Sequence, residues 1–225
     1  MKINFQPHFE KYQALVTMAD EVFEKVQKEF PESVTCKIKC ADCCHALFDI
    51  TLIEAIYIND RCNKLIKGKE KKRLLARSNQ ADRKTYKIKR KAYQDKQAGK
   101  NDMKILIEMA AERVRCPLLN DEDLCSLYEN RPITCRLYGI PTSTNSISHT
   151  CGKSGFVEGK QYPTVNLDII QKKLYEISAE FVIQIKTKYA QMAEMLVPVS
   201  MALLAQYDED YLGITKPEQD KSKQG

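Results

Sequence analysis

Four cysteines lie within nine residues, from Cys36 to Cys44, in the stretch Cys-Lys-Ile-Lys-Cys-Ala-Asp-Cys-Cys. A segment this short cannot hold four thiols apart, and it cannot pack all of them as small apolar side chains. The thiols therefore need a shared partner, which is a disulfide network, a catalytic dithiol or a metal. Five further cysteines follow, at positions 62, 116, 125, 135 and 151.

Disulfides persist in oxidising compartments, which proteins reach with an export signal. The first eight residues contain no apolar signal core, and the longest apolar run, residues 195–205, is interrupted by Pro198 and Ser200. That run is shorter than the roughly 20 residues needed to span a bilayer. We therefore expect a cytoplasmic protein with no membrane segment, in which clustered cysteines serve as metal ligands or redox groups.

Basic residues are concentrated between Lys64 and Lys100, where 15 lysines and arginines accompany three acids, although the whole chain carries only +6. Charge runs of this kind usually form a solvated helical surface. The sharper hypothesis is a binding surface for nucleic acid or another polyanion, in which Tyr86 and Tyr93 stack between the basic clusters. The sequence leaves both interpretations open.

Apolar residues recur at spacings of three and four, which predicts a mainly α fold. Helices are expected at about 8–30, 51–66, 101–114, 132–139, 166–185 and 193–207, with one or two more in the basic segment. Thr51 and Glu54 form a capping-box pattern at the start of the second helix. On the buried face of the helix after Asn101 we expect Ile105 and Leu106, together with Met109, Ala110 and Val114.

The segment from Cys116 to Tyr128 predicts a short hairpin, with its turn at residues 120–123. We expect a single domain over residues 1–215, made of helices and a small cysteine-rich lobe that consists of a loop and this hairpin. Residues 30–155 form its cysteine-rich core, residues 64–100 are a basic helical insertion, and residues 216–225 are a disordered tail.

Eight of the nine cysteines form the predicted metal site: Cys36, Cys40, Cys43, Cys44, Cys116, Cys125, Cys135 and Cys151. Soft thiolate sulfur selects zinc, copper(I) or iron–sulfur clusters, and eight ligands suit two four-coordinate ions or one cluster and one ion. Adjacent cysteines cannot easily both bind one small ion, so one of Cys43 and Cys44 bridges, binds a second metal or stays a free reactive thiol. Cys62 lies mid-helix among apolar residues and is left out of the site.

Two arginines flank Cys135 in the sequence. Four thiolates around Zn²⁺ or around an oxidised four-iron cluster leave a net charge of about −2, which requires nearby cations and hydrogen-bond donors. We expect Arg131 and Arg136 to supply them. His45 and His149, each close to a cysteine, are alternatives to a thiolate, although a loop histidine is more often simply hydrogen-bonded.

These residues resemble a known family. The elements that carry the resemblance are Cys36-x3-Cys40-x2-Cys43-Cys44, Cys116-Pro-Leu-Leu, Cys125-Ser-Leu-Tyr-Glu-Asn-Arg-Pro-Ile-Thr-Cys135-Arg-Leu-Tyr, and Cys151. They are similar to the bacterial YkgJ-like or CxxCxxCC cysteine-cluster proteins, which are described as zinc- or iron-chelating domains. The resemblance spans residues 30–155 and implies a metal or iron–sulfur site on the eight cysteines, with no settled reaction. The segment from Lys64 to Lys100 looks longer and more basic than the usual connection.

We expect metal binding through thiolates, with an iron–sulfur cluster and a redox link ahead of zinc because eight thiolates exceed what one structural zinc needs. The second interpretation is a structural zinc module that mediates protein or nucleic-acid interaction. A third is an S-adenosylmethionine-linked methyl-transfer or redox enzyme, because Cys36, Cys40 and Cys43 have the spacing of radical enzymes of that kind and the flagellin lysine methylases resemble this cysteine pattern. The sequence shows no series of strand–helix units that would build the barrel of such enzymes.

Overall fold

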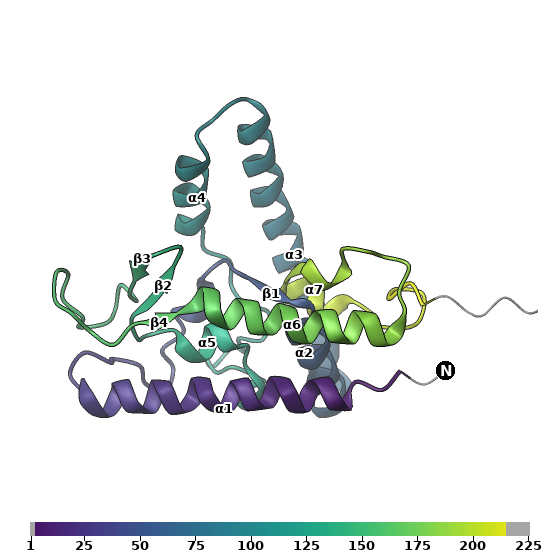
Figure 1. Cartoon of the computed structure of the whole chain (residues 1–225), viewed down its shortest axis with the longest axis horizontal. Helices are drawn as coiled ribbons and strands as arrows, with labels where there is room; N and C mark the ends of the chain where they lie inside the picture. The colour runs from purple at the N-terminus through teal and green to yellow at the C-terminus, as the bar shows by residue number, and fades with distance from the viewer. Residues whose placement is uncertain (1–2, 215–225) are drawn as a thin grey trace, which may run out of the picture.

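Two long helices form the base of the molecule in the computed structural model, which describes residues 3–214 (Figure 1). They are α1, Gln6–Glu29, and α6, Leu167–Ile185, and they run antiparallel. Helix α6 begins where the sequence predicts, since the Asn166 side chain accepts a 2.9 Å hydrogen bond from the Asp168 amide. The tail predicted at residues 216–225 lies outside the described residues.

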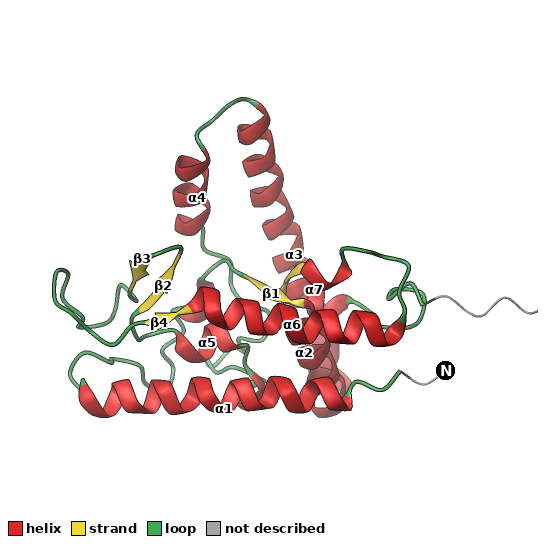
Figure 2. Cartoon of the chain, viewed as in Figure 1, coloured by secondary structure: helices red, strands yellow, loops and turns green. Residues whose placement is uncertain are grey.

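Helix α2, Leu52–Leu65, is the centre of the fold, and every residue from 52 to 59 is buried. One apolar cluster packs α2 against the base helices and includes Tyr12, Ile56 and Phe181. A second cluster lies on the other side of α2 and includes Leu74 and Leu203. Helices dominate the described chain (Figure 2), so the predicted mainly α fold is confirmed.

The predicted capping box at the start of α2 does more than cap one helix. The Glu54 carboxylate accepts hydrogen bonds from the Thr51 amide at 3.1 Å and from the Thr51 hydroxyl at 3.0 Å. Its other oxygen accepts a 3.1 Å bond from the amide of Ile133, the first residue of α5, Ile133–Leu137. One buried carboxyl therefore holds the N-termini of α2 and of a helix that carries Cys135.

The basic segment and the helix that follows it form a helical arm that projects from the base (Figure 1). It consists of α3, Gly68–Gln97, and α4, Asp102–Ala111, which Asn101 caps by accepting a 3.2 Å bond from the Lys104 amide. The predicted buried face of α4 is wrong in part. Within α4 only Ile105 is buried and Leu106 is 59% exposed, because the arm leaves the outer side of α4 uncovered.

Strands are few and short within the described residues. β1, Asp49–Thr51, pairs antiparallel with β5, Leu196–Pro198. β2, Thr142–Thr144, pairs antiparallel with β3, Ile147–His149, and parallel with β4, Val165–Asn166. The hairpin predicted after Cys116 has only two antiparallel backbone bonds, of 2.8 and 2.9 Å, and one bridge.

The helix predicted at residues 193–207 is wrong in its extent, because only residues 199–204 of that range form an α-helix. The chain instead forms a 3₁₀ turn at Met192–Glu194, then β5, and then the short helix α7, Val199–Leu204. Pro198 lacks an amide hydrogen and cannot continue a helix, whereas it fits the end of β5. Among residues 3–214, no helix has the length and apolar character to cross a membrane.

Candidate metal centre

Backbone hydrogen bonds join the two cysteine-bearing segments of the chain. The Cys116 amide donates to the Cys44 carbonyl at 2.7 Å, and the Val114 amide donates to the His45 carbonyl at 3.0 Å. A bridge between Ala46 and Arg113 extends this pairing. The contact brings cysteines from the two halves of the sequence into one region.

Five of the eight predicted thiols line one pocket of about 60 Å³: Cys43, Cys44, Cys116, Cys125 and Cys135. The short 3₁₀ turn Cys43–His45 supplies the first two, the minimal hairpin supplies the next two, and α5 supplies Cys135. Arg131 and apolar residues, including Phe48 and Pro198, complete the wall. The pocket therefore combines soft sulfur donors with a largely apolar surround.

The other three thiols, Cys36, Cys40 and Cys151, are not among the residues that line this pocket, although the charges of Cys40 and Cys151 act on Cys36. Cys43 connects the two groups, because its charge acts on Cys36 as well as on Cys116 and Cys135. All eight cysteines are half-buried, and every cysteine of the chain is a free thiol. The structure therefore contains no cysteine pair that supports the disulfide interpretation.

Gly139 makes room for one of these thiols. Its φ is +109°, and a Cβ at this position would lie 2.3 Å from the Cys36 sulfur. The Cys36 thiol also donates to the Tyr138 carbonyl at 3.6 Å. Only glycine allows the backbone to approach the sulfur this closely, and the sequence analysis did not identify this residue.

Backbone amides point at three of the sulfur atoms. The Lys153 amide donates to the Cys151 sulfur at 3.4 Å. The Leu127 amide acts to lower the pKa of Cys125, and the Leu118 and Leu119 amides act to lower that of Cys116, both against the larger effect of burial. In each case a donor comes from two residues after the cysteine. Amide donors stabilise the thiolate form, which is the form that binds metal.

Electrostatics in the site oppose a set of unpaired thiolates. Burial, followed by the charges of Cys40 and Cys151, raises the pKa of Cys36 to about 11. Burial likewise raises the pKa of Cys116 to about 12 and that of Cys135 well above its ordinary value. A cation in place of the protons would remove the repulsion between the sulfurs, which is how metal binding is coupled to thiol deprotonation.

Cys43 and Cys44 differ although they are adjacent, with their sulfurs 4.0 Å apart. The hydrogen bond from Cys44 lowers the pKa of Cys43 to about 7, and the Arg131 guanidinium acts in the same direction. The same contact raises the pKa of Cys44. Cys43, the thiol that connects the two groups, is therefore the most readily ionised of the adjacent pair.

The two arginines flanking Cys135 have different surroundings. Arg131 lines the pocket, helps to lower the pKa of Cys43, and partly opposes the burial that raises the pKa of Cys125 and Cys135. Its guanidinium lies 3.6 Å from the centre of the Tyr128 ring. The described hydrogen bonds of Arg136 go elsewhere, to the Asp20 carboxylate at 2.6 Å and to the carbonyls of Glu129 and Arg131. Arg136 ties α5 to α1, and it reaches the site only through the Arg131 backbone.

Asp42 is a site residue that the sequence analysis missed. It accepts hydrogen bonds from Arg113 at 2.8 Å and from the Tyr138 hydroxyl at 2.9 Å, and the Cys151 thiol lies 3.8 Å away. These contacts tie the loop before Cys43 to the segments that carry Cys116 and Cys151. The sequence did offer one indication of this role, since Asp42 lies between Cys40 and Cys43.

The remaining histidine and cysteine candidates make other contacts. Cys62 is buried in α2, where the Lys71 ammonium lies 3.1 Å from its sulfur. The Nδ1 of His45 lies 2.9 Å from the Ala41 carbonyl, and His149 is exposed on β3. Within residues 3–214, no three cysteine, histidine or acidic side chains are already drawn close enough to enclose a metal ion.

The donor chemistry nevertheless fits zinc or iron, because thiolates are the preferred ligands of structural zinc and of iron–sulfur clusters. A family model named CxxCxxCC and described as "Putative zinc- or iron-chelating domain" matches residues 35–152. That range contains all eight cysteines and most of the pocket wall. No curated protein and no solved structure matches the chain.

Proposed function

The chain belongs to the CxxCxxCC family, and we propose that it binds an iron–sulfur cluster or zinc through its eight clustered cysteine thiolates. The observation that carries this proposal is that five of the eight thiols line one pocket, with backbone amides that act to lower the pKa of Cys116, Cys125 and Cys151 against burial. Such donors favour thiolates, yet the thiolates repel one another unless a cation joins them.

The proposed ligands are Cys36, Cys40, Cys43, Cys44, Cys116, Cys125, Cys135 and Cys151. Eight thiolates are twice what one tetrahedral ion takes, which favours a cluster, or a cluster and an ion, over a single structural zinc. When bound, a cluster would supply electron transfer, and this supports a redox-linked role. Arg131 is the proposed counter-charge, since it lines the pocket, helps to lower the pKa of Cys43 and opposes the effect of burial on the pKa of Cys125.

Elemental analysis of anaerobically purified protein tests this function. We expect iron with acid-labile sulfide and broad visible absorption, and Cys116→Ala should lose most of the metal. Cys62→Ala is the matched control, because Cys62 is buried in α2 and is not among the proposed ligands. Metal-free protein from all preparations, or equal metal in both variants, would refute the proposal.

A structural zinc module that mediates protein or nucleic-acid interaction is the second candidate. The link from Arg113 and Tyr138 to Asp42 favours it, because these bonds give the cysteine lobe a fixed framework around the thiols. A colourless holoprotein with stoichiometric zinc and no sulfide would support this role. The same result would exclude the cluster.

An S-adenosylmethionine-linked enzyme is the third candidate, and it rests on the spacing of Cys36, Cys40 and Cys43. In the structure these three thiols lie in different surroundings, since Cys43 lines the pocket and Cys36 lies against Gly139. The strands of residues 3–214 form sheets of two and three strands. A spectral change when S-adenosylmethionine is added to the reduced anaerobic protein would favour this candidate.

A further inference from the structure

Helix α3 keeps its few acidic side chains engaged. Glu70 pairs with Arg77 at 2.7 Å, Asp95 pairs with Lys100 at 3.0 Å, and Asp82 lies 3.3 Å from the Ser200 hydroxyl. Each carboxylate is thus matched by a partner within the protein. Three carboxylates are too few to balance the basic residues of α3, and two of them, Glu70 and Asp95, are already paired with Arg77 and Lys100.

Several basic residues of α3 are equally engaged with the body of the protein. Lys89 pairs with Asp49 at 2.5 Å, and Lys84 donates to the Arg113 carbonyl at 2.7 Å. Others are exposed and make no hydrogen bond or ion pair with the described part of the chain: Arg73, Arg83, Lys87, Arg90 and Lys91. These free cations are not needed to hold the arm in place.

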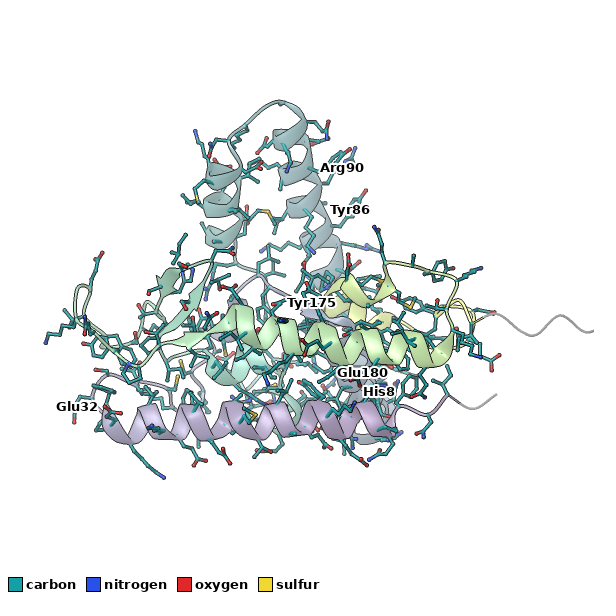
Figure 3. All side chains as sticks on the ribbon, in the orientation of Figure 1. His8, Glu32, Tyr86, Arg90, Tyr175 and Glu180 are labelled. Atoms are coloured by element: carbon teal, nitrogen blue, oxygen red, sulfur yellow. The ribbon has the colours of Figure 1, made fainter. Side chains whose placement is uncertain are left out.

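Three of these cations share one face of α3 with two tyrosines. We define the Arg–Tyr face as Arg83, Tyr86, Lys87, Arg90 and Tyr93, whose spacings of three and four residues place them on one side of a helix. Tyr86 and Tyr93 are 63% and 64% exposed. Figure 3 shows Tyr86 and Arg90 directed away from α4 and into solvent.

We propose that the Arg–Tyr face binds single-stranded nucleic acid, with Arg83, Lys87 and Arg90 contacting phosphates and the tyrosine rings stacking on bases. Cations and aromatic rings that alternate along a surface are the combination that single strands require. The buried residues of α3, Leu74, Ser78, Ala81 and Thr85, lie on the opposite side of the helix at 3.6 residues per turn, so a strand could follow the face without disturbing the core.

The observations favour a single strand over a duplex and over a membrane. Bases in a duplex are stacked on one another and offer no open ring face to a tyrosine. The exposed apolar residues of the arm, Met103, Leu106 and Ile107, belong to α4, and the Arg–Tyr face is turned away from that helix. The arm therefore does not combine its free cations and its apolar residues on one membrane-facing surface.

Fluorescence anisotropy of the full-length, metal-loaded protein with labelled single-stranded RNA or DNA of about 16 nucleotides tests the proposal. We expect binding at low salt, with an affinity that falls as salt is added. The variant R83Q/K87Q/R90Q should bind more weakly and reduce the slope of log affinity against log salt by about 2, because each phosphate contact contributes about 0.7. The matched control K25Q/K28Q/K173Q removes the same charge from exposed sites outside α3 and should bind as the wild type does.

The tyrosines give a readout that charge alone would not move. Y86A and Y93A should each weaken single-strand binding about tenfold at an unchanged salt slope. Duplex bound as tightly as the single strand, equal weakening in the control, or no binding at low salt would overturn the proposal. So would preferential binding to phosphatidylglycerol vesicles. Metal content, measured on the same samples, reports separately on the thiol site and on folding.

Discussion

Replacing Glu54 by alanine should destabilise the fold and loosen the metal centre together. Glu54 is 3% exposed and accepts from two backbone amides, those of Thr51 and Ile133. Each buried amide left without an acceptor costs about 1–3 kcal/mol. Because burying the carboxyl group is itself unfavourable, its removal recovers part of this cost. We therefore expect the free energy of unfolding to fall by about 3 kcal/mol, which lowers Tm by about 6–12 °C for a chain of this length.

The effect on the metal follows from what Glu54 holds. The Ile133 amide begins α5, and α5 carries Cys135. Without its acceptor the first turn of α5 is less fixed, so a chelator should strip metal from Glu54→Ala faster than from the wild type. Urea unfolding and the rate of metal transfer to a coloured chelator measure the two effects on the same preparation.

The pH dependence gives a second test of the same residue. Burial raises the pKa of Glu54, so the folded state holds this proton more tightly than the unfolded state does. The contribution of Glu54 to stability is therefore complete below the carboxyl pKa of the unfolded chain and decreases as pH rises through the folded value. Glu54→Gln, which cannot ionise, should show a stability deficit relative to wild type that narrows with rising pH.

A control variant separates these effects from the loss of any glutamate. Glu24 is exposed on α1, and Glu24→Ala should change stability by less than about 0.5 kcal/mol. If Glu54→Ala is as stable as Glu24→Ala, the amides of Thr51 and Ile133 find other acceptors, and the reasoning on Glu54 is wrong.

Three further outcomes are expected. Gly139→Ala would place a Cβ 2.3 Å from the Cys36 sulfur, so both metal content and stability to urea should fall. The control is Gly159→Ala, because Gly159 also has a positive φ but has open space around it. The control should cost only about 1–2 kcal/mol, and Gly139→Ala should cost more. Equal losses would show that the Cys36 sulfur moves freely. Arg131→Gln should weaken metal retention by about tenfold in chelator competition, because it removes the cation beside the thiols. Chelation of the wild-type protein should lower its Tm and change its circular dichroism, and an unchanged melting curve would contradict coupling between metal binding and folding of the cysteine lobe.

Local chemistry made much of the fold predictable. The Thr51–Glu54 capping box and the Asn166 cap depend on residues within one turn of each other, and both helices begin where those residues predict. Pro198 is also a local signal, because it cannot continue a helix, but the apolar residues around it led to the prediction of a helix where β5 lies. A pairing between β1 and β5, whose residues lie almost 150 positions apart, has no local signal.

The sequence by itself determined that eight thiols fall in two segments, residues 36–44 and 116–151, and that one segment holds the excess positive charge. Only the tertiary structure decided that the backbone amide of Cys116 bonds to the carbonyl of Cys44 and that Asp42 joins the loop before Cys43 to Arg113. It also decided that Arg131 faces the pocket while Arg136 binds Asp20. The physical reason is range. Helix caps and periodicity act over a few residues, whereas the surroundings of a thiol depend on how the whole core brings distant segments together.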